Sequence, residues 1–191
     1  MFVCFVLYSF MPQPLPTFLT TSSPGGNYTL ALKGQKTRPV FFTVEVRFDV
    51  MKSGTPLLSN MFLFSADGMD PPFESLYPNQ RWIDDHSIQF YREENLRNSP
   101  DELIIVNNTG KIIRYARINS DDIILFFDLP PGFKTSTKLS PSKGDYKRVY
   151  VKSEFADGTS IDEAGPAFAI GSEPKTFYVD LRSDKTIVRG P

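Results

Sequence analysis

One stretch in the first half of the chain alternates apolar and polar residues without a break. In residues 42–50, Phe or Val occupies every second position, and Thr, Glu, Arg and Asp fill the positions between them. That is the period of a strand with one buried and one solvated face, because successive strand side chains point to opposite sides. The alternation recurs along the chain, and no window shows a helical stripe longer than about two turns. The sequence therefore predicts an all-β protein.

Length and composition agree with this class and exclude some functions. A chain of 191 residues can form one large β-sandwich or two small β-domains. Its 17 Phe and 8 Tyr suit a pleated surface, and its 16 Pro and 12 Gly supply turns. The net charge of −1 is balanced along the chain, with neither half strongly basic or acidic, so we expect no nucleic-acid partner. The single cysteine, Cys4, excludes an intramolecular disulfide and a cysteine-based zinc site.

The first 32 residues carry no charged side chain, and residues 2–11 are nearly all apolar. This run is too short to span a bilayer, which takes about 20 residues, so we expect no integral membrane domain. It has the length of a signal-peptide core, and the alternative is a buried first strand. Pro12, Pro14 and Pro16 follow as in a flexible spacer. We therefore expect an exported protein, secreted or periplasmic, that folds from about Ser23.

Turn residues divide the rest of the chain. We expect an N-terminal segment over residues 1–22, a β-rich domain over 23–97, an immunoglobulin-like antiparallel β-sandwich over 101–182, and a tail over 183–191. The sandwich is predicted because short strands alternate regularly with turns. The predicted strands cover residues 103–106, 112–118, 123–129, 147–155, 167–170 and 176–181. Residues 123–127 are apolar without alternation, which predicts a central strand with both faces covered.

Two short runs resemble a known pattern. Ser-Pro-Gly-Gly-Asn-Tyr-Thr at 23–29 and Trp-Ile-Asp-Asp-His-Ser-Ile at 82–88 resemble a signature of small uncharacterised bacterial exported β-proteins. In that signature Ser-Pro-Asp-Gly-x-Tyr precedes Trp-x-Asp-Asp or Trp-x-Asp-Asn, and Gly25 here replaces the first Asp. The second half is similar to bacterial immunoglobulin-like modules in Asn-Asn-Thr-Gly-Lys at 107–111 and Phe-Ala-Asp-Gly at 155–158. The resemblance implies export and fold, and it carries no activity.

Aromatic residues in and after a long loop are the predicted ligand-binding residues. Pro and Gly interrupt residues 66–80, and a loop of this length is often functional. Phe73 and Tyr77 lie in this loop, where a ring has less reason to be buried, and Trp82 follows it. Exposed rings stack on sugars or pack against a protein. Tyr91 and Tyr178 are further aromatic candidates.

The only histidine lies in an acidic run, which suggests a hydrolase as an alternative. Asp84, Asp85, His86 and Ser87 supply the residue types of a catalytic triad. Neighbours on an extended chain point to opposite faces, so we expect a turn here and no catalytic group. Acidic residues offer oxygen ligands for calcium, but none follows the spacing of a calcium loop, and we expect no metal or cofactor. These acids are Asp67, Asp70, Asp84, Asp85, Asp121 and Asp122.

The leading hypothesis is an exported, non-enzymatic β-module that binds a protein or a polysaccharide through its loops. A structural or assembly subunit that associates through open strand edges is another alternative, and the oligomeric state stays open. Two N-glycosylation sequons begin at Asn27 and Asn107, a motif short enough to arise by chance.

Overall fold

The computed structural model describes residues 15–34, 44–66, 73–92, 96, 99, 101–141, 146–169 and 176–190. This part of the chain is all-β, with fourteen strands and one four-residue helix. It divides into two compact units, and the boundary lies between Pro72 and Phe73. The turn Ser23–Gly26 belongs with the second unit.

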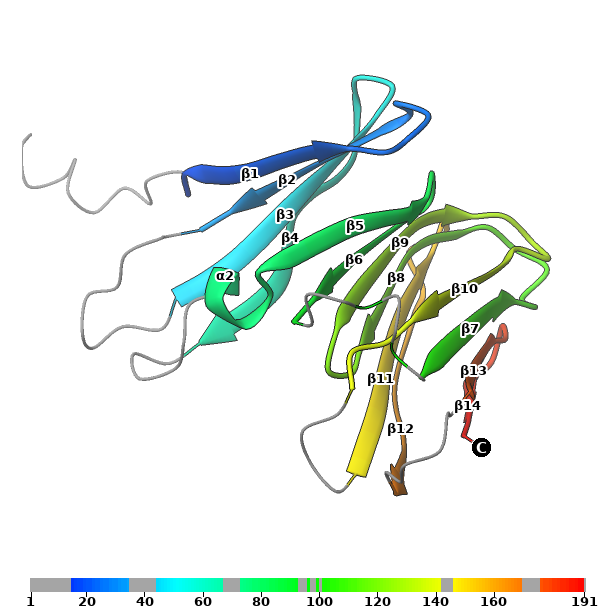
Figure 1. Cartoon of the computed structure of the whole chain (residues 1–191). Coiled ribbons are helices and arrows are strands. Elements are labelled where there is room, and N and C mark those ends of the chain that lie inside the picture. Colours follow the sequence, from blue (N-terminus) through cyan, green and yellow to red (C-terminus); the bar gives the residue numbers. More distant parts are fainter. Residues whose placement is uncertain are drawn as a thin grey trace, which may run out of the picture. The chain divides into compact units, whose positions relative to one another are not determined.

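The first unit contains one four-stranded antiparallel sheet with the order β1-β2-β3-β4 (Figure 1). The strong alternation of the sequence is confirmed here, because β3 buries Val46, Phe48 and Val50 and leaves Glu45 exposed. Phe42 lies outside the described residues. The strands are β1 (Thr17–Ser22), β2 (Tyr28–Lys33), β3 (Val44–Lys52) and β4 (Thr55–Ala66).

The turn between β3 and β4 follows directly from its sequence. Ser53 and Gly54 both have positive φ, 47° and 81°, as in a two-residue turn whose twist matches the flanking strands. Glycine adopts this conformation without steric cost, and it occupies the second position. The two strands pair antiparallel across this turn.

The expectation that folding begins near Ser23 is wrong, because β1 already starts at Thr17 and pairs with β2. Residues 1–14, with Cys4, lie outside the described part of the chain. The predicted tail is also wrong in part, since β14 (Thr186–Arg189) pairs antiparallel with β13 (Thr176–Leu181). Pairing with a neighbouring strand, rather than a strong local pattern, makes both short segments strands.

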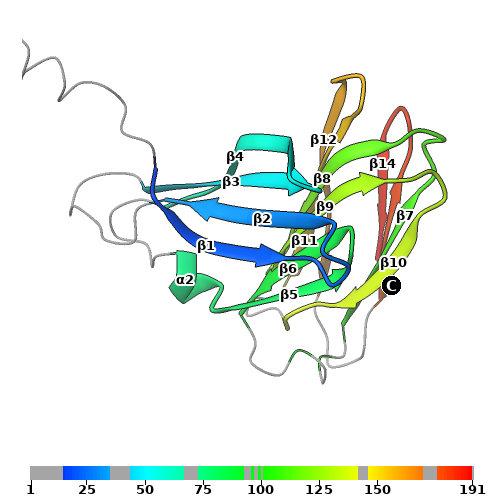
Figure 2. The same ribbon diagram turned by 90° about the horizontal axis from the view of Figure 1, so that it is seen from above.

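The second unit contains a six-stranded sheet and a four-stranded sheet that lie face to face (Figure 2). The six-stranded order is β12-β11-β8-β9-β6-β5, and the four-stranded order is β10-β7-β13-β14. All pairs are antiparallel except β7 with β13. The remaining elements are α2 (Phe73–Leu76), β5 (Asn79–Asp84), β6 (Ser87–Tyr91), β7 (Glu102–Asn107), β8 (Ile113–Asn119), β9 (Ile123–Leu129), β10 (Lys134–Lys138), β11 (Tyr146–Phe155) and β12 (Ser160–Ala169).

The core of the second unit forms where the inner faces of these sheets meet. Leu103 and Ile105 of β7 and Phe177, Val179 and Leu181 of β13 belong to it. They are joined by apolar residues of β8, β9 and β11, none of them more than 4% exposed. This packing of two sheets is a β-sandwich. The immunoglobulin-like strand arrangement stays a prediction.

Strand β9 lies inside the six-stranded sheet, between β8 and β6. Residues 123–127 are at most 2% exposed, so both faces of the strand are covered. The prediction of a central strand from its unbroken apolar run is therefore confirmed.

The division between the units differs from the expected boundary between residues 97 and 101. Strands β5 and β6 form a hairpin, and β6 pairs with β9 through contacts such as Ile88 with Leu125. Residues 79–91 are thus part of the same sheet as the chain after residue 101. Sheet pairing, rather than the polar linker, decides where the units separate.

Candidate functional site

The ring of Phe73 does not lie exposed in a loop. It begins helix α2, is 4% exposed, and packs against the rings of Tyr77 and Phe90 at centroid distances of 5.2 and 5.7 Å. The expectation that this ring is exposed is therefore wrong, because a short helix turns it onto apolar neighbours. Phe73 is unavailable for stacking in this conformation.

Tyr77 and Trp82 are half-buried. The Tyr77 ring also faces the guanidinium of Arg92 at 5.5 Å, and the Trp82 ring lies 6.3 Å from that of Phe127. Trp82 lines a pocket of about 350 Å³ between β5 and β10, together with Arg81 and Thr137. A ligand-binding role for Tyr77 and Trp82 stays a prediction.

Asp84, Asp85 and His86 lie at the tight turn between β5 and β6. Asp84 Oδ1 accepts hydrogen bonds from the His86 amide at 2.8 Å and from the Ser87 hydroxyl at 2.7 Å. The His86 ring bonds instead through Nδ1 to the Phe127 carbonyl at 3.0 Å. In a catalytic triad the serine hydroxyl bonds to the imidazole, whereas here the Ser87 hydroxyl bonds to the Asp84 carboxylate. The arrangement is that of a structural turn.

The acidic residues do not come together into a cation site in the part of the chain that the structure describes. There, no three His, Cys, Asp or Glu side chains approach one another closely enough to hold a metal. Asp85 accepts the Gly25 amide at 2.5 Å, and Asp122 accepts the amides of Gln89 and Ser140 at 2.7 and 2.8 Å. Asp67 and Asp70 lie outside the described residues.

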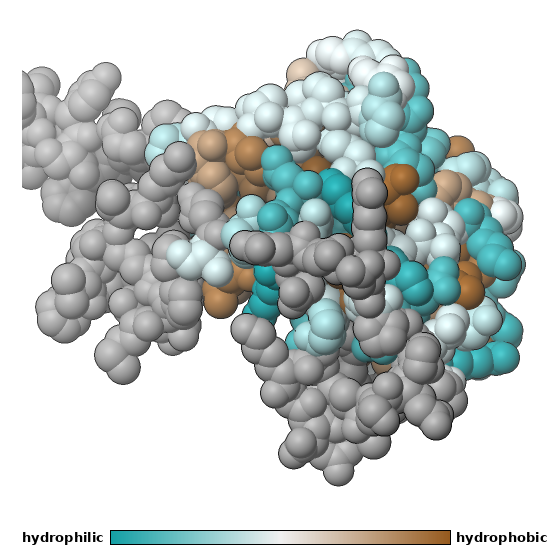
Figure 3. Space-filling model, in the orientation of Figure 1, coloured by the Kyte–Doolittle hydropathy of each residue, from teal (hydrophilic) through white to brown (hydrophobic). Residues whose placement is uncertain are grey.

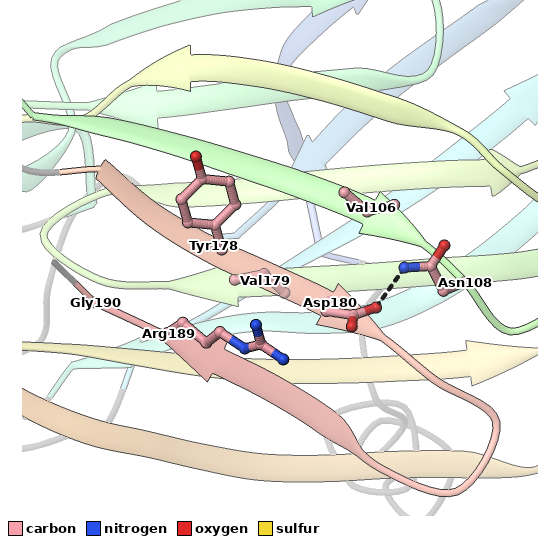
Figure 4. A pocket seen from close by; sticks show the side chains of 7 residues that line it. All are labelled: Val106, Asn108, Tyr178, Val179, Asp180, Arg189 and Gly190. Carbon is pink, nitrogen blue, oxygen red and sulfur yellow. Dashed lines mark hydrogen bonds between the residues drawn. The ribbon is translucent and has the colours of Figure 1, made fainter.

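A shallow pocket of about 400 Å³ lies on the outer face of the four-stranded sheet of the second unit, β10-β7-β13-β14 (Figure 4). Side chains on β13 alternate, so the core takes Phe177 and Val179 while Tyr178 and Asp180 point outward. Tyr178 is 46% exposed, although it is a large aromatic residue. The pocket is lined by Val106, Asn108, Tyr178, Val179, Asp180, Arg189 and Gly190.

The polar groups of this pocket are held in part by one another. Asp180 Oδ1 accepts a hydrogen bond of 2.7 Å from Asn108 Nδ2, and Asp180 Oδ2 forms an ion pair of 2.9 Å with Arg182. The carboxylate is thus bonded on both oxygens. The guanidinium of Arg189, by contrast, makes no hydrogen bond or ion pair with the described residues. The pocket therefore combines an exposed ring, a fixed acid and amide, and an exposed cation.

Sequence reasoning reached only part of this site. It included Tyr178 among the aromatic candidates, but it placed Arg189 in a tail and did not name Asn108 as a candidate. The site forms because β7 and β13 pair in parallel, which brings Val106 opposite Asp180. The only local signal was that Tyr178 and Asp180, two residues apart, lie on the same face of the predicted strand.

No family model, no curated protein and no solved structure matches this chain. Within the described ranges, no helix is long and apolar enough to cross a membrane.

Proposed function

We propose that this chain is a non-enzymatic binding module that holds a polysaccharide on the outer face of the four-stranded sheet of its second unit. The observation that carries the proposal is the Tyr178 ring, which stands exposed in a shallow pocket beside polar groups. The neighbouring β13 side chains Phe177 and Val179 are at most 1% exposed, so the strand has its apolar side elsewhere. The core gains nothing from a tyrosine at this position.

The chemistry of the pocket suits a sugar. A sugar ring has apolar C–H faces and a rim of hydroxyls, and an aromatic side chain offers a flat apolar surface with a polar edge. Asn108 and Asp180 lie beside the ring with their amide and carboxylate held in place by a mutual hydrogen bond. A few fixed polar groups around an apolar surface give a binding site its orientation and specificity.

The face drawn in Figure 3 does not favour protein docking through a broad apolar surface of the described residues. On the face drawn in Figure 3, hydrophobic residues of the described part occur as separate patches among hydrophilic ones. Docking surfaces for proteins are usually broad and continuous. Export, expected from the apolar first residues, remains part of the proposal, because cell-surface polysaccharides lie outside the cell.

The test is a binding screen of the full chain against neutral and acidic polysaccharides, followed by calorimetry with soluble oligomers of each polymer that binds. Tyr178→Ala is expected to weaken binding about fivefold or more, because aromatic stacking contributes about 1 kcal/mol or more to such contacts. Tyr178→Phe should keep most of the affinity, since it keeps the ring.

Tyr150→Ala is the matched control for this experiment. Tyr150 is 45% exposed, lies on β11 of the other sheet, and has its hydroxyl bonded to Arg148 at 3.3 Å. Its removal should leave the affinity unchanged. If no polysaccharide binds, or if Tyr150→Ala and Tyr178→Ala weaken binding equally, the proposed function is wrong.

A further inference from the structure

We propose that the sugar units held on this face carry a carboxylate, and that Arg189 is the residue that binds it. This inference rests on the proposed function and names its ligand class, an acidic polysaccharide. Three observations support it: the position of Arg189 beside the ring, the ion pair that the pocket's Asp180 makes with another arginine, and the charge of the surrounding face.

Arg189 lies directly beside the stacking surface. In the antiparallel pair of β13 and β14, Tyr178 and Arg189 are cross-strand partners, and both are exposed on the outer face (Figure 4). Directly opposed residues of such a pair have their Cβ atoms about 5 Å apart. A sugar stacked on Tyr178 therefore places its ring substituents within reach of the Arg189 guanidinium.

The acid within the pocket already has its own cation. Asp180 is bound by Arg182 through Nη2 at 2.9 Å and through Nε at 3.0 Å, which leaves its charge locally balanced. Arg189 makes no such pair with the described residues. A guanidinium presents two parallel N–H groups that match the two oxygens of a carboxylate, so an exposed, unengaged arginine suits this ligand group.

The charges around the pocket favour an anion. Lys134 of β10 is the cross-strand partner of Val106, which lines the pocket. Lys134, Arg182 and Arg189 against Asp180 give a local excess of two positive charges, whereas the whole chain has a net charge of −1. Further along the sheet, Glu102 lies opposite Lys138, and this pair adds no net charge. A polymer with a negative charge on each unit complements this face.

The experiment compares matched ligands on the full chain by calorimetry. The acidic probes are oligomers of galacturonate, of alginate and of hyaluronan, and the neutral probes are glucan, mannan and chitin oligomers. The best acidic probe is then converted to its methyl ester, which removes the charge and keeps the sugar chain. Dextran sulfate serves as a polymer that is charged but lacks carboxylates.

We expect one acidic probe to bind at least about tenfold more tightly than every neutral probe and than its own ester, because a charge-assisted hydrogen bond contributes about 1.5 kcal/mol or more. Arg189→Ala should abolish this preference, and Arg189→Lys should restore only part of it, since an ammonium lacks the paired geometry. Arg148→Ala, which removes an exposed arginine of β11, should keep the preference intact.

The possible failures are distinguishable. If a neutral probe or the ester binds as tightly as the acid and the binding depends on Tyr178, the acidic-sugar inference is overturned and the proposed function stands. If dextran sulfate binds as tightly as the best acidic probe through Arg189, charge alone is recognised and the carboxylate assignment is wrong. If no sugar binds in a Tyr178-dependent way, both proposals fail.

Discussion

At the scale of single residues, Asn107 matches a glycosylation motif but serves the fold. It is 0% exposed, and its Nδ2 donates hydrogen bonds to the carbonyls of Lys111, Leu129 and Pro130 at 2.9–3.0 Å. Its Oδ1 accepts from the amide and hydroxyl of Thr109. The polar groups of the side chain thus close the turn after β7 and bind it to the end of β9. The amide nitrogen is therefore not accessible for modification in the folded chain.

Asp49 is a residue whose ionisation stabilises the first unit. Partial burial would raise the pKa of Asp49, but the hydrogen bond and charge of Lys33 and the hydrogen bond from the Asn60 amide outweigh it and hold the pKa below its ordinary value of 3.8. Asn60 has a positive φ of 55° in β4, so the Asp49 carboxylate fixes an irregular point of that strand. The carboxylate therefore contributes stability only while it is ionised.

We predict that Asp49→Asn lowers the free energy of unfolding by about 1 kcal/mol at pH 7. Because the folded pKa lies below the unfolded one, the contribution is present above about pH 3.8 and is lost as the pH falls further. Urea unfolding of both proteins at several pH values should show the difference vanish in acid. Glu45→Gln, which alters an exposed ion pair on the same strand, should have little effect. A difference that persists unchanged in acid would contradict the assignment.

At the scale of elements, local pattern predicted the strands whose side chains alternate or are wholly apolar. It predicted β3 and β13 because burial of one face gives alternating apolar residues, and β9 because burial of both faces gives an unbroken apolar run. It missed β10, whose sequence Lys-Thr-Ser-Thr-Lys contains no apolar residue. This edge segment is a strand because it pairs with β7 and sends Thr137 inward to a polar group, which a hydrophobic pattern cannot show.

The polar group that β10 meets is Gln89 of β6, which is 0% exposed. Gln89 Oε1 accepts from the Thr137 hydroxyl at 2.7 Å and from Arg81 at 3.1 Å. Its Nε2 donates to Asp122 at 2.7 Å and to the Lys138 carbonyl at 2.8 Å. This one amide therefore links the edges of the two sheets.

We predict that Gln89→Leu destabilises the protein by about 3 kcal/mol, although the two side chains have similar volumes. The change removes the Gln89 amide that binds both Thr137 and Asp122, so each keeps fewer hydrogen bonds in a buried site. Lost hydrogen bonds cost the most where the groups are buried, above all for a charged group. Thermal and urea unfolding of the full chain measure the loss. Ser136→Ala, at an exposed neighbouring position of β10, should change stability by less than about 0.5 kcal/mol. A loss that small for Gln89→Leu would show that the network contributes little.

At the scale of the whole molecule, the arrangement of the sheets depends on pairings between strands that are far apart in the sequence. Local sequence patterns do not reveal these pairings. The parallel pair of β7 and β13 places Leu103 opposite Phe177, and no pattern in the sequence between them predicts this pairing. The candidate site depends on this pair, so its residues were identifiable one by one but not as a group. The unit boundary was missed for the same reason, since β6 pairs with β9 across the expected linker.

This pairing predicts that residues 101–191 do not fold as a separate domain. Without β6, strand β9 becomes an edge, and the backbone bond from Phe127 N to His86 O is lost. Ile123, Leu125 and their neighbours, all at most 2% exposed in the full chain, would lie along this edge. A long apolar edge strand promotes aggregation, and Asp122 would also lose its bond from Gln89.

The measurement is a comparison of the 101–191 fragment with the full chain by circular dichroism, amide NMR and sedimentation. We expect the full chain to unfold cooperatively and to give dispersed amide signals. The fragment should give a poorly dispersed spectrum or aggregate, because it lacks both the sheet partner of β9 and the amide that links the two sheets. A fragment that stays monomeric with dispersed signals and a cooperative transition would show that residues 101–191 form an independent sandwich. In that case β5 and β6 would be additions to its edge rather than part of its core.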